Sequence, residues 1–281
     1  MVAVLTSAQR GRALVLNLFK RWPALRMYDN SVAFTKRTAP VSRSFFVFLA
    51  LFALWWVLLF VFYRFPDIDL AVAKSVFTTA PCTSAAPLGD ICGTFALAKN
   101  RPFEIVRDVT LALPYIAIVV LIATLVSSWR KYGARWRTLQ TDRYIAALIS
   151  LAIGCGLIVN TLLKSYGGRP RPRATDLFGG SLDFVQAGSF AGRCLGNCSF
   201  VSGEASSGGW LLCLVVLLPP RLRFPLGIPL AIISITMPVL RVMTGAHYLS
   251  DAVLGWLLSL VVFAAAIAVI DLLRSGTPAR S

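Results

Sequence analysis

The one histidine of the chain, His247, is followed four residues later by Asp251. Residues at this spacing share one face of a helix, so the Asp251 carboxylate could hold one imidazole nitrogen and leave the other free to attack an electrophile. The simpler interpretations are a helix cap for Asp251 and a polar interfacial side chain for His247. Because the sequence has no second histidine, no histidine pair can share a metal ion or form a proton relay.

Two further clusters carry groups that bind anions. One is the run 164–173, which contains Lys164, Arg169, Arg171 and Arg173. The other is Ser202-Gly203-Glu204, which precedes an apolar segment, while Arg241 lies six residues before His247. A Ser-Gly turn at a helix N-terminus presents unpaired N–H groups and a positive dipole end, which suit a phosphate. The alternatives are anionic lipid headgroups as the partner of the basic run, and a simple helix cap for Ser202.

The composition indicates which elements position these clusters. The chain is 57% hydrophobic and 14% charged, whereas soluble domains are about 45–50% apolar and about 25% charged. About 20 apolar residues span a bilayer as a helix, and five uncharged segments meet this length: Phe45–Tyr63, Val109–Trp129, Tyr144–Leu163, Phe224–Leu240 and Ala252–Ile270. A shorter sixth, Ala205–Leu218, is included because the connectivity requires it. The sequence therefore predicts an all-α integral membrane protein with six transmembrane helices.

The basic residues give the orientation. The chain has 28 Lys and Arg against 12 Asp and Glu, a net charge of +16, which in a soluble protein would suggest nucleic-acid binding. Here the cations gather before the first predicted span and between the second and third spans, which indicates cytoplasmic loops and both termini in the cytoplasm. We therefore expect no nucleic-acid partner. The predicted organisation is a basic arm (residues 1–44), a membrane domain (45–273) and a cytoplasmic tail (274–281).

This topology brings the three clusters together. The 38 residues between Ser202 and Arg241 suffice for one helix down, a turn at Pro219-Pro220 and one helix back. All three clusters then lie at the outer face of the bilayer. Four or five cations, a Ser-Gly turn and a carboxylate-backed histidine at one place predict metal-independent phosphoryl transfer through a phosphohistidine.

Four cysteines fall in loops assigned to the outer side, where an oxidising compartment favours disulfides: Cys82, Cys92, Cys194 and Cys198. The local pairings are 82–92 and 194–198, and cross-pairing is the alternative. The Cys-x3-Cys spacing without further ligands does not favour zinc, so neither a metal nor a cofactor is expected.

The clusters resemble the three motifs of the type 2 phosphatidic acid phosphatase superfamily. Those motifs are Lys-x6-Arg-Pro, Pro-Ser-Gly-His and Ser-Arg-x5-His-x3-Asp. The matching segments here are Lys164 to Pro172, Val201 to Glu204, and Leu240 to Asp251. Leu240 replaces the serine of the third motif, and Glu204 replaces the histidine of the second. The resemblance covers about residues 45–273, including the six-helix layout.

By position, the resemblance makes His247 the nucleophile, oriented by Asp251, and places Glu204 where the family has its general acid. The phosphate would be bound by Lys164, Arg171, Ser202, the Gly203 backbone and Arg241. A glutamate in the place of the acid favours a better leaving group than an ordinary alkoxide. The expected substrate is therefore lipid A 1-phosphate or a similar glycosyl or polyprenyl phosphate. The chain also resembles bacterial lipid A 1-phosphatases, which implies a multi-pass protein of the inner membrane with its site facing the periplasm.

Other functions remain open at this stage. On the same site, the alternatives are a phosphatidylglycerophosphate or undecaprenyl-diphosphate phosphatase, and a transferase that passes the phosphate to an acceptor lipid. The alternative of another class is a non-catalytic lipid-binding protein or transporter. Transport is disfavoured because the ionisable residues lie at the ends of the predicted spans and not at their centres.

Overall fold

The computed structural model describes residues 41–82, 91–95 and 97–275. The predicted N-terminal arm (1–44) and tail (274–281) therefore lie almost entirely outside the described residues.

Among the described residues, five helical segments are long and apolar enough to cross a membrane, and each contains one of the five long predicted spans. They are α2 (Val41–Arg64), α4 (Arg101–Tyr132), α5 (Leu139–Ser150) with its continuation, α8 (Pro220–Met243) and α9 (Leu249–Ser275). Helix α5 continues through the π-helical segment η2 (Leu151–Leu163) into α6 (Lys164–Tyr166). A short 3-10 turn, η1 (Gly133–Arg135), connects α4 to α5. The five long predicted spans are thus confirmed as helices.

The sixth predicted span is shorter than the others. It consists of α7 (Gly203–Cys213) and the 3-10 turn η5 (Leu214–Leu217), about 24 Å in all, against about 30 Å of hydrocarbon. Its side chains are mostly buried, and a Cβ on Gly209 would lie only 2.2 Å from the Trp256 carbonyl oxygen of α9. Helices enclosed by other helices need not match the bilayer thickness, and small residues let their backbones approach closely. A sixth membrane-length helix is therefore not confirmed.

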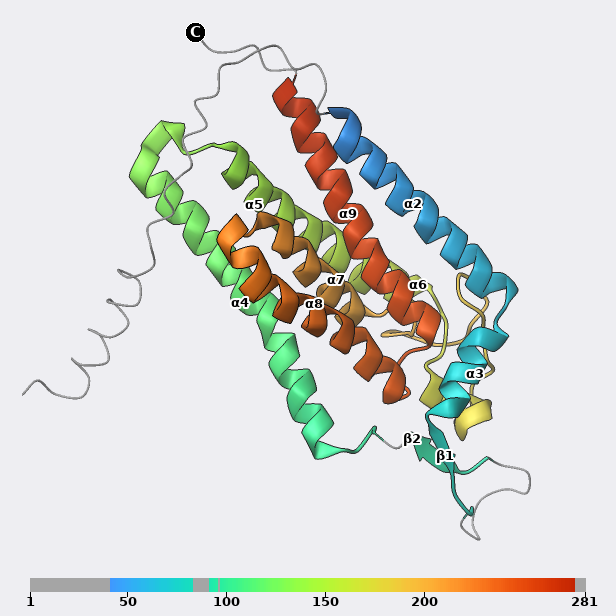
Figure 1. The fold of residues 1–281 in the computed structure, drawn as a ribbon. Coiled ribbons are helices and arrows are strands. Elements are labelled where there is room, and N and C mark those ends of the chain that lie inside the picture. The colour runs from blue at the N-terminus through green and yellow to red at the C-terminus, as the bar shows by residue number, and fades with distance from the viewer. Residues whose placement is uncertain (1–40, 83–90, 96, 276–281) are drawn as a thin grey trace, which may run out of the picture. The chain divides into compact units, whose positions relative to one another are not determined.

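Helix α9 is the centre of the bundle. It packs against α2, α5, α7 and η2, and its neighbour α2 lies along it for most of its length (Figure 1). Helix α2 is almost entirely exposed on its other side, with 6% of its most apolar window buried, as expected for a helix that faces lipid. The hairpin of α7 and α8 returns the chain to the end of the bundle where α9 begins, as the sequence predicted.

The polar connections at that end contain structure that the hydropathy pattern did not predict. Helix α3 (Asp67–Ser75) follows α2, and β1 (Phe77–Thr79) pairs antiparallel with β2 (Gly93–Phe95). Two 3-10 turns follow the basic run, η3 (Pro172–Ala174) and η4 (Asp176–Phe178). Disulfides join Cys82 to Cys92 and Cys194 to Cys198, which are the local pairings.

The small hairpin also supports the loop that carries His247. Phe95 of β2 packs with Phe77, Phe178 and Tyr248 in one buried cluster. The loop residue Gly245 has φ +61°, and a Cβ there would lie 2.3 Å from the Phe95 ring. Only glycine combines this backbone conformation with so close an approach. The hairpin therefore braces the loop from the outside.

Candidate active site

His247 lies in the loop between α8 and α9 and is 2% exposed. Its Nδ1 is 2.8 Å from the backbone carbonyl oxygen of Ser199. A carbonyl can only accept, so this contact requires a proton on Nδ1 and leaves the lone pair on Nε2. Asp251 Oδ2 is 3.9 Å from Nδ1, which is beyond hydrogen-bond distance. The Ser199 carbonyl therefore holds the ring directly.

Asp251 acts on His247 through the groups around it. Its Oδ2 accepts hydrogen bonds from the Ser199 hydroxyl at 2.5 Å and from the Tyr248 backbone N–H at 3.0 Å. Its Oδ1 accepts from Arg169 Nη1 at 2.6 Å. Asp251 thus fixes the Ser199 residue that holds the histidine, and it also caps the start of α9.

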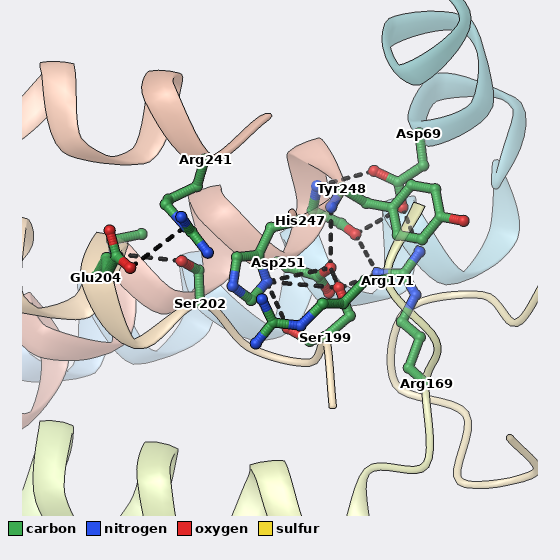
Figure 2. Close-up of polar contacts among 12 residues, drawn as sticks. Asp69, Arg169, Arg171, Ser199, Ser202, Glu204, Arg241, His247, Tyr248 and Asp251 are labelled. Carbon is green, nitrogen blue, oxygen red and sulfur yellow. Dashed lines mark hydrogen bonds and ion pairs between the residues drawn. The ribbon is translucent and has the colours of Figure 1, made fainter. Parts of the chain in front are cut away.

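The cation behind Asp251 is completely buried. Arg169 bridges Asp251 and Asp69, and its Nη2 lies 2.7 Å from Asp69 Oδ2 (Figure 2). Asp69, on α3, also accepts hydrogen bonds from the Ser250 N–H at 2.8 Å and the Ser250 hydroxyl at 2.6 Å. Burial alone would lower the pKa of Arg169, but the two carboxylates outweigh it and raise that pKa above its ordinary value. We call Asp69, Arg169, Ser250 and Asp251 the rear network.

A second carboxylate lies on the other side of the histidine loop. Glu204, in the first turn of α7, accepts a bidentate hydrogen bond from Arg107 of α4, at 2.7 Å from Nη2 and 3.1 Å from Nε. Arg241 Nε is 3.5 Å from Glu204 Oε1, and this buried nitrogen has no hydrogen-bond partner among the described residues. Both oxygens of Glu204 thus accept from Arg107 in a charge-assisted, bidentate pair. We call Glu204, Arg107 and Arg241 the front cluster.

The remaining predicted phosphate ligands lie beside the front cluster. A Cβ on Gly203 would be 3.1 Å from Lys164 Nζ, so glycine allows the lysine to approach the start of α7. Ser202 is the N-cap of α7 and accepts a hydrogen bond from the Ala205 N–H at 3.3 Å, as the capping interpretation expected. Arg171 donates to the Asn197 side-chain oxygen at 2.8 Å. Burial and the neighbouring Arg173 lower the pKa of Arg171, as expected where positive charge exceeds negative charge.

These cations act together on the histidine. Burial, followed by the charges of Arg171, Arg241 and Lys164, lowers the pKa of His247 well below its ordinary value of 6.5. The ring is therefore neutral at neutral pH, and its Nε2 lone pair is available as a nucleophile. The structure brings residues from all three sequence clusters around this ring.

Sequence reasoning missed four residues of the site. Asp69, Ser199 and Arg107 belong to no cluster that spacing singled out, and Arg169 was one cation among four in the basic run. The signal for Arg169 was its place in that run, but nothing distinguished it from its neighbours as the buried one. Within the described part of the chain, no group of three or more His, Cys, Asp or Glu could hold a metal ion.

Comparison with known proteins identifies the family. The profile of the PAP2 superfamily matches residues 143–274. A lipid A 4'-phosphatase of Rhizobium leguminosarum is 48% identical over 79% of this chain and 96% of its own. A second lipid A 4'-phosphatase, of Rhizobium etli, is 45% identical over 85% of this chain and 95% of its own. The chain belongs to the PAP2 superfamily, as the motifs predicted.

Two other proteins match less closely. A lipid A 4'-phosphatase of Francisella tularensis subsp. novicida is 36% identical over 37% of this chain and 48% of its own. A solved transmembrane PAP2-type phosphatidylglycerolphosphate phosphatase of Bacillus subtilis has 16% identity and a TM-score of 0.48, covering 84% of this chain and 100% of that one. Membership rests on the two Rhizobium relatives. The protein is a multi-pass membrane lipid phosphatase of the PAP2 type.

Proposed function

We propose that the protein removes the 4'-phosphate of lipid A or a close analogue through a phosphohistidine on His247. The observation that carries the chemistry is the buried, neutral imidazole, held at Nδ1 by the Ser199 carbonyl and surrounded by three cations. The names of the two relatives that match over almost their whole length support the 4' position. They favour it over the 1-phosphate that the leaving-group argument favoured.

The proposed reaction has two steps. Nε2 attacks phosphorus, the phosphorus–oxygen ester bond breaks, and the alcohol leaves with a proton. Water then attacks the phosphohistidine, releases inorganic phosphate and restores the neutral ring. Lys164, Arg171, Arg241 and the Ser202-Gly203 helix start would neutralise the charge on the transferring group. No step requires a metal ion.

With a 4'-phosphate as substrate, the question of whether Glu204 donates a proton becomes more important. An ordinary ring hydroxyl is a poorer leaving group than an anomeric one, so proton transfer to it matters more. Since both oxygens of Glu204 accept hydrogen bonds from Arg107, we propose that Glu204 orders the front cluster and that water supplies the proton to the leaving oxygen. Glu204 could serve as the general acid only after leaving Arg107.

The proposed placement has the active-site end in the periplasm of a bacterial inner membrane, both termini in the cytoplasm and the α7 segment as a sixth crossing. Both disulfides lie in the connections at the active-site end, and disulfides persist in oxidising compartments. At the opposite end, the last turn of α4 carries Arg130 and Lys131, and the α4–α5 connection carries Arg135 and Arg137, in agreement with the positive-inside rule.

The decisive experiment gives the purified protein lipid A that carries both phosphates and determines by mass spectrometry which one is lost. We expect loss of the 4'-phosphate as inorganic phosphate, and no loss with His247→Ala. Loss of the 1-phosphate would contradict the proposed 4' position and would support the substrate that the leaving-group argument favoured. Parallel assays with phosphatidylglycerophosphate, undecaprenyl diphosphate and an acceptor lipid test the alternative substrates and the transferase.

A further inference from the structure

The disulfide between Cys194 and Cys198 closes a short loop beside the active site, which we call the disulfide loop (residues 194–198). Gly196 and Asn197 within it have positive φ values of +64° and +32°. Asparagine is one of the few residues besides glycine that adopt this region readily, so this pair suits the tight reversal that the loop makes. The sequence therefore supports the loop conformation without help from burial.

Backbone hydrogen bonds fasten the disulfide loop to the basic run that carries the proposed phosphate ligands. The Cys194 N–H donates to the Gly168 carbonyl oxygen at 2.9 Å, and the Cys198 N–H donates to the Lys164 carbonyl oxygen at 3.4 Å. Both ends of the loop are thus tied to the run, one of them at Lys164 itself. The position of the loop is therefore coupled to the position of the ligands.

The disulfide loop presents two oxygens to Arg171. Arg171 Nη2 donates to Asn197 Oδ1 at 2.8 Å and to the Asn197 carbonyl oxygen at 3.2 Å, and Arg171 Nε donates to the same carbonyl at 3.3 Å. Among the described residues, Asn197 is the one hydrogen-bond partner of this guanidinium. Arg171 lies beside the His247 ring (Figure 2), so Asn197 determines where this positive charge lies at the site.

The residue that follows the loop orients the proposed nucleophile. The Ser199 N–H donates to the Arg169 carbonyl oxygen at 2.8 Å, and the Ser199 carbonyl oxygen holds His247 Nδ1 at 2.8 Å. Two consecutive steps along the chain, Asn197 and Ser199, therefore contact a proposed phosphate ligand and the attacking ring. The disulfide at Cys198 lies between them.

We propose that the disulfide loop is a positioning element for phosphoryl transfer, with Asn197 as the positioning residue of Arg171. The inference rests on the proposed function and adds a residue outside the three motif segments, since Asn197 lies between the first and the second. A cation already directed at the transferring group needs no reorganisation when charge develops there, which is how such groups accelerate a reaction.

The first test removes the Asn197 side chain and keeps the backbone conformation. Asn197→Gly tolerates the positive φ but lacks the Oδ1 acceptor. We expect kcat/KM for phosphate release from lipid A to fall about three- to tenfold, since the lost bond is charge-assisted but exposed to water. In an Arg171→Gln background the same substitution should have no further effect, because it acts through Arg171. Leu195→Ala is the matched control, since Leu195 is 97% exposed in the same loop, and it should leave kcat/KM unchanged.

The second test opens the loop. Cys194→Ser combined with Cys198→Ser should lower kcat/KM by about tenfold or more, because Arg171 and Ser199 both lose support. Size-exclusion chromatography in detergent checks that the protein remains folded. Binding of inorganic phosphate, measured as the rise in unfolding temperature, gives a readout without catalysis. It should weaken in Asn197→Gly and stay unchanged in Leu195→Ala.

The outcomes separate a positioning role from a structural one. Unchanged kcat/KM in Asn197→Gly would overturn the proposal. A loss of the same size in the Arg171→Gln background, or in Leu195→Ala, would overturn it too, since the loop would then support only the fold. If the unaltered protein released no phosphate from any lipid phosphate, the proposed function would fail, and the phosphate-binding measurement would still decide the role of Asn197.

Discussion

A carboxylate held by two arginines occurs at both ends of the helix bundle. At the end opposite the active site, Asp142 of α5 accepts from Arg137 at 2.9 Å and from Arg274 of α9 at 2.7 Å. At the active-site end, Glu204 binds Arg107 at 2.7 Å and lies 3.5 Å from Arg241. Residues 251 and 274 of α9 place the two ends roughly 35 Å apart.

Each cluster has one carboxylate and two arginines, but the clusters differ in how the arginines are hydrogen-bonded and how far they are exposed. The Asp142 side chain is 5% exposed and both of its arginines are hydrogen-bonded to it, so the cluster clasps α5 to the end of α9. The Glu204 side chain is 20% exposed, Arg241 Nε lies 3.5 Å from it with no hydrogen-bond partner among the described residues, and Lys164 and Arg171 add positive charge nearby. Partly exposed arginines that are hydrogen-bonded to one carboxylate stabilise a fold, whereas an excess of desolvated cations beside a neutral imidazole suits an anionic ligand.

The largest effect on activity is expected when His247, the proposed nucleophile, is replaced. His247→Ala should lower kcat by more than about 10⁴-fold, because no other imidazole exists to form the covalent intermediate. Phosphate release from lipid A measures the loss, and size-exclusion chromatography in detergent checks that the protein remains folded. Residual turnover near that of the unaltered protein would end the phosphohistidine mechanism.

The next effect tests the rear network, which resembles the Asp142 clasp because all of its charged groups are hydrogen-bonded to one another. Asp69→Asn keeps the shape of the side chain but leaves Arg169 with one carboxylate instead of two. We expect kcat to fall about tenfold or more per folded molecule, with KM within about twofold, because Asp251 and Ser199 lose their fixed positions. An Asp69→Asn protein with unaltered kcat would make the network purely structural. Thermal unfolding should also occur at a lower temperature, since breaking a buried ion pair is costly.

Glu204→Gln and Asp142→Asn compare the two clusters directly. We expect the first to slow alkyl, glycosyl-1- and aryl phosphates about equally, by about ten- to a hundredfold, because Arg107 and Arg241 lose their anchor. The second should leave turnover within about twofold and lower only thermal stability. If the alkyl phosphate suffers most and the aryl phosphate hardly at all, Glu204 is instead the general acid, as its place in the second motif implied.

The pH dependence of kcat/KM tests the positive charge around His247. Because burial and three cations lower the pKa of His247 below 6.5, protonation should not inactivate the ring until the pH falls below that value. The acid limb of kcat/KM is therefore expected below pH 6.5. The groups that face the ring are Lys164, Arg171, Arg241 and Asp251, with the Ser199 carbonyl opposing them. Arg171→Gln removes one positive charge, so the limb should move to higher pH. A limb that stays in place would remove Arg171 from the field at the histidine.

The smallest effect on activity and stability is expected at the Asp142 cluster. Arg274→Met removes one arm of the clasp, but the Arg274 side chain is 40% exposed and such pairs contribute about 0–1 kcal/mol. Activity should stay within about twofold and the unfolding temperature should fall by a few degrees at most. The matched change at the other end, Arg107→Met, should lower activity clearly. Equal effects of the two substitutions would remove the functional distinction between the clusters.

Local patterns in the sequence were sufficient for much of this protein. Five helices follow from runs of apolar residues, since a helix satisfies its own backbone hydrogen bonds within one segment. The spacing of His247 and Asp251, the Lys164–Pro172 run and the Ser202-Gly203 turn identified the superfamily, and they predicted most of the residues that the structure gathers around His247. The pairings Cys82–Cys92 and Cys194–Cys198 were also the local ones.

Tertiary structure alone decided what holds these residues in place. Arg169 meets Asp69 across 100 residues of sequence, and Arg107 meets Glu204 across 97, distances at which no periodicity carries information. The group that orients His247 is a backbone carbonyl, which every residue possesses and no residue type reveals. The burial of α7 depends on how neighbouring helices pack. Residue types and short spacings are written in the sequence, whereas contacts between distant segments exist only once the chain has folded.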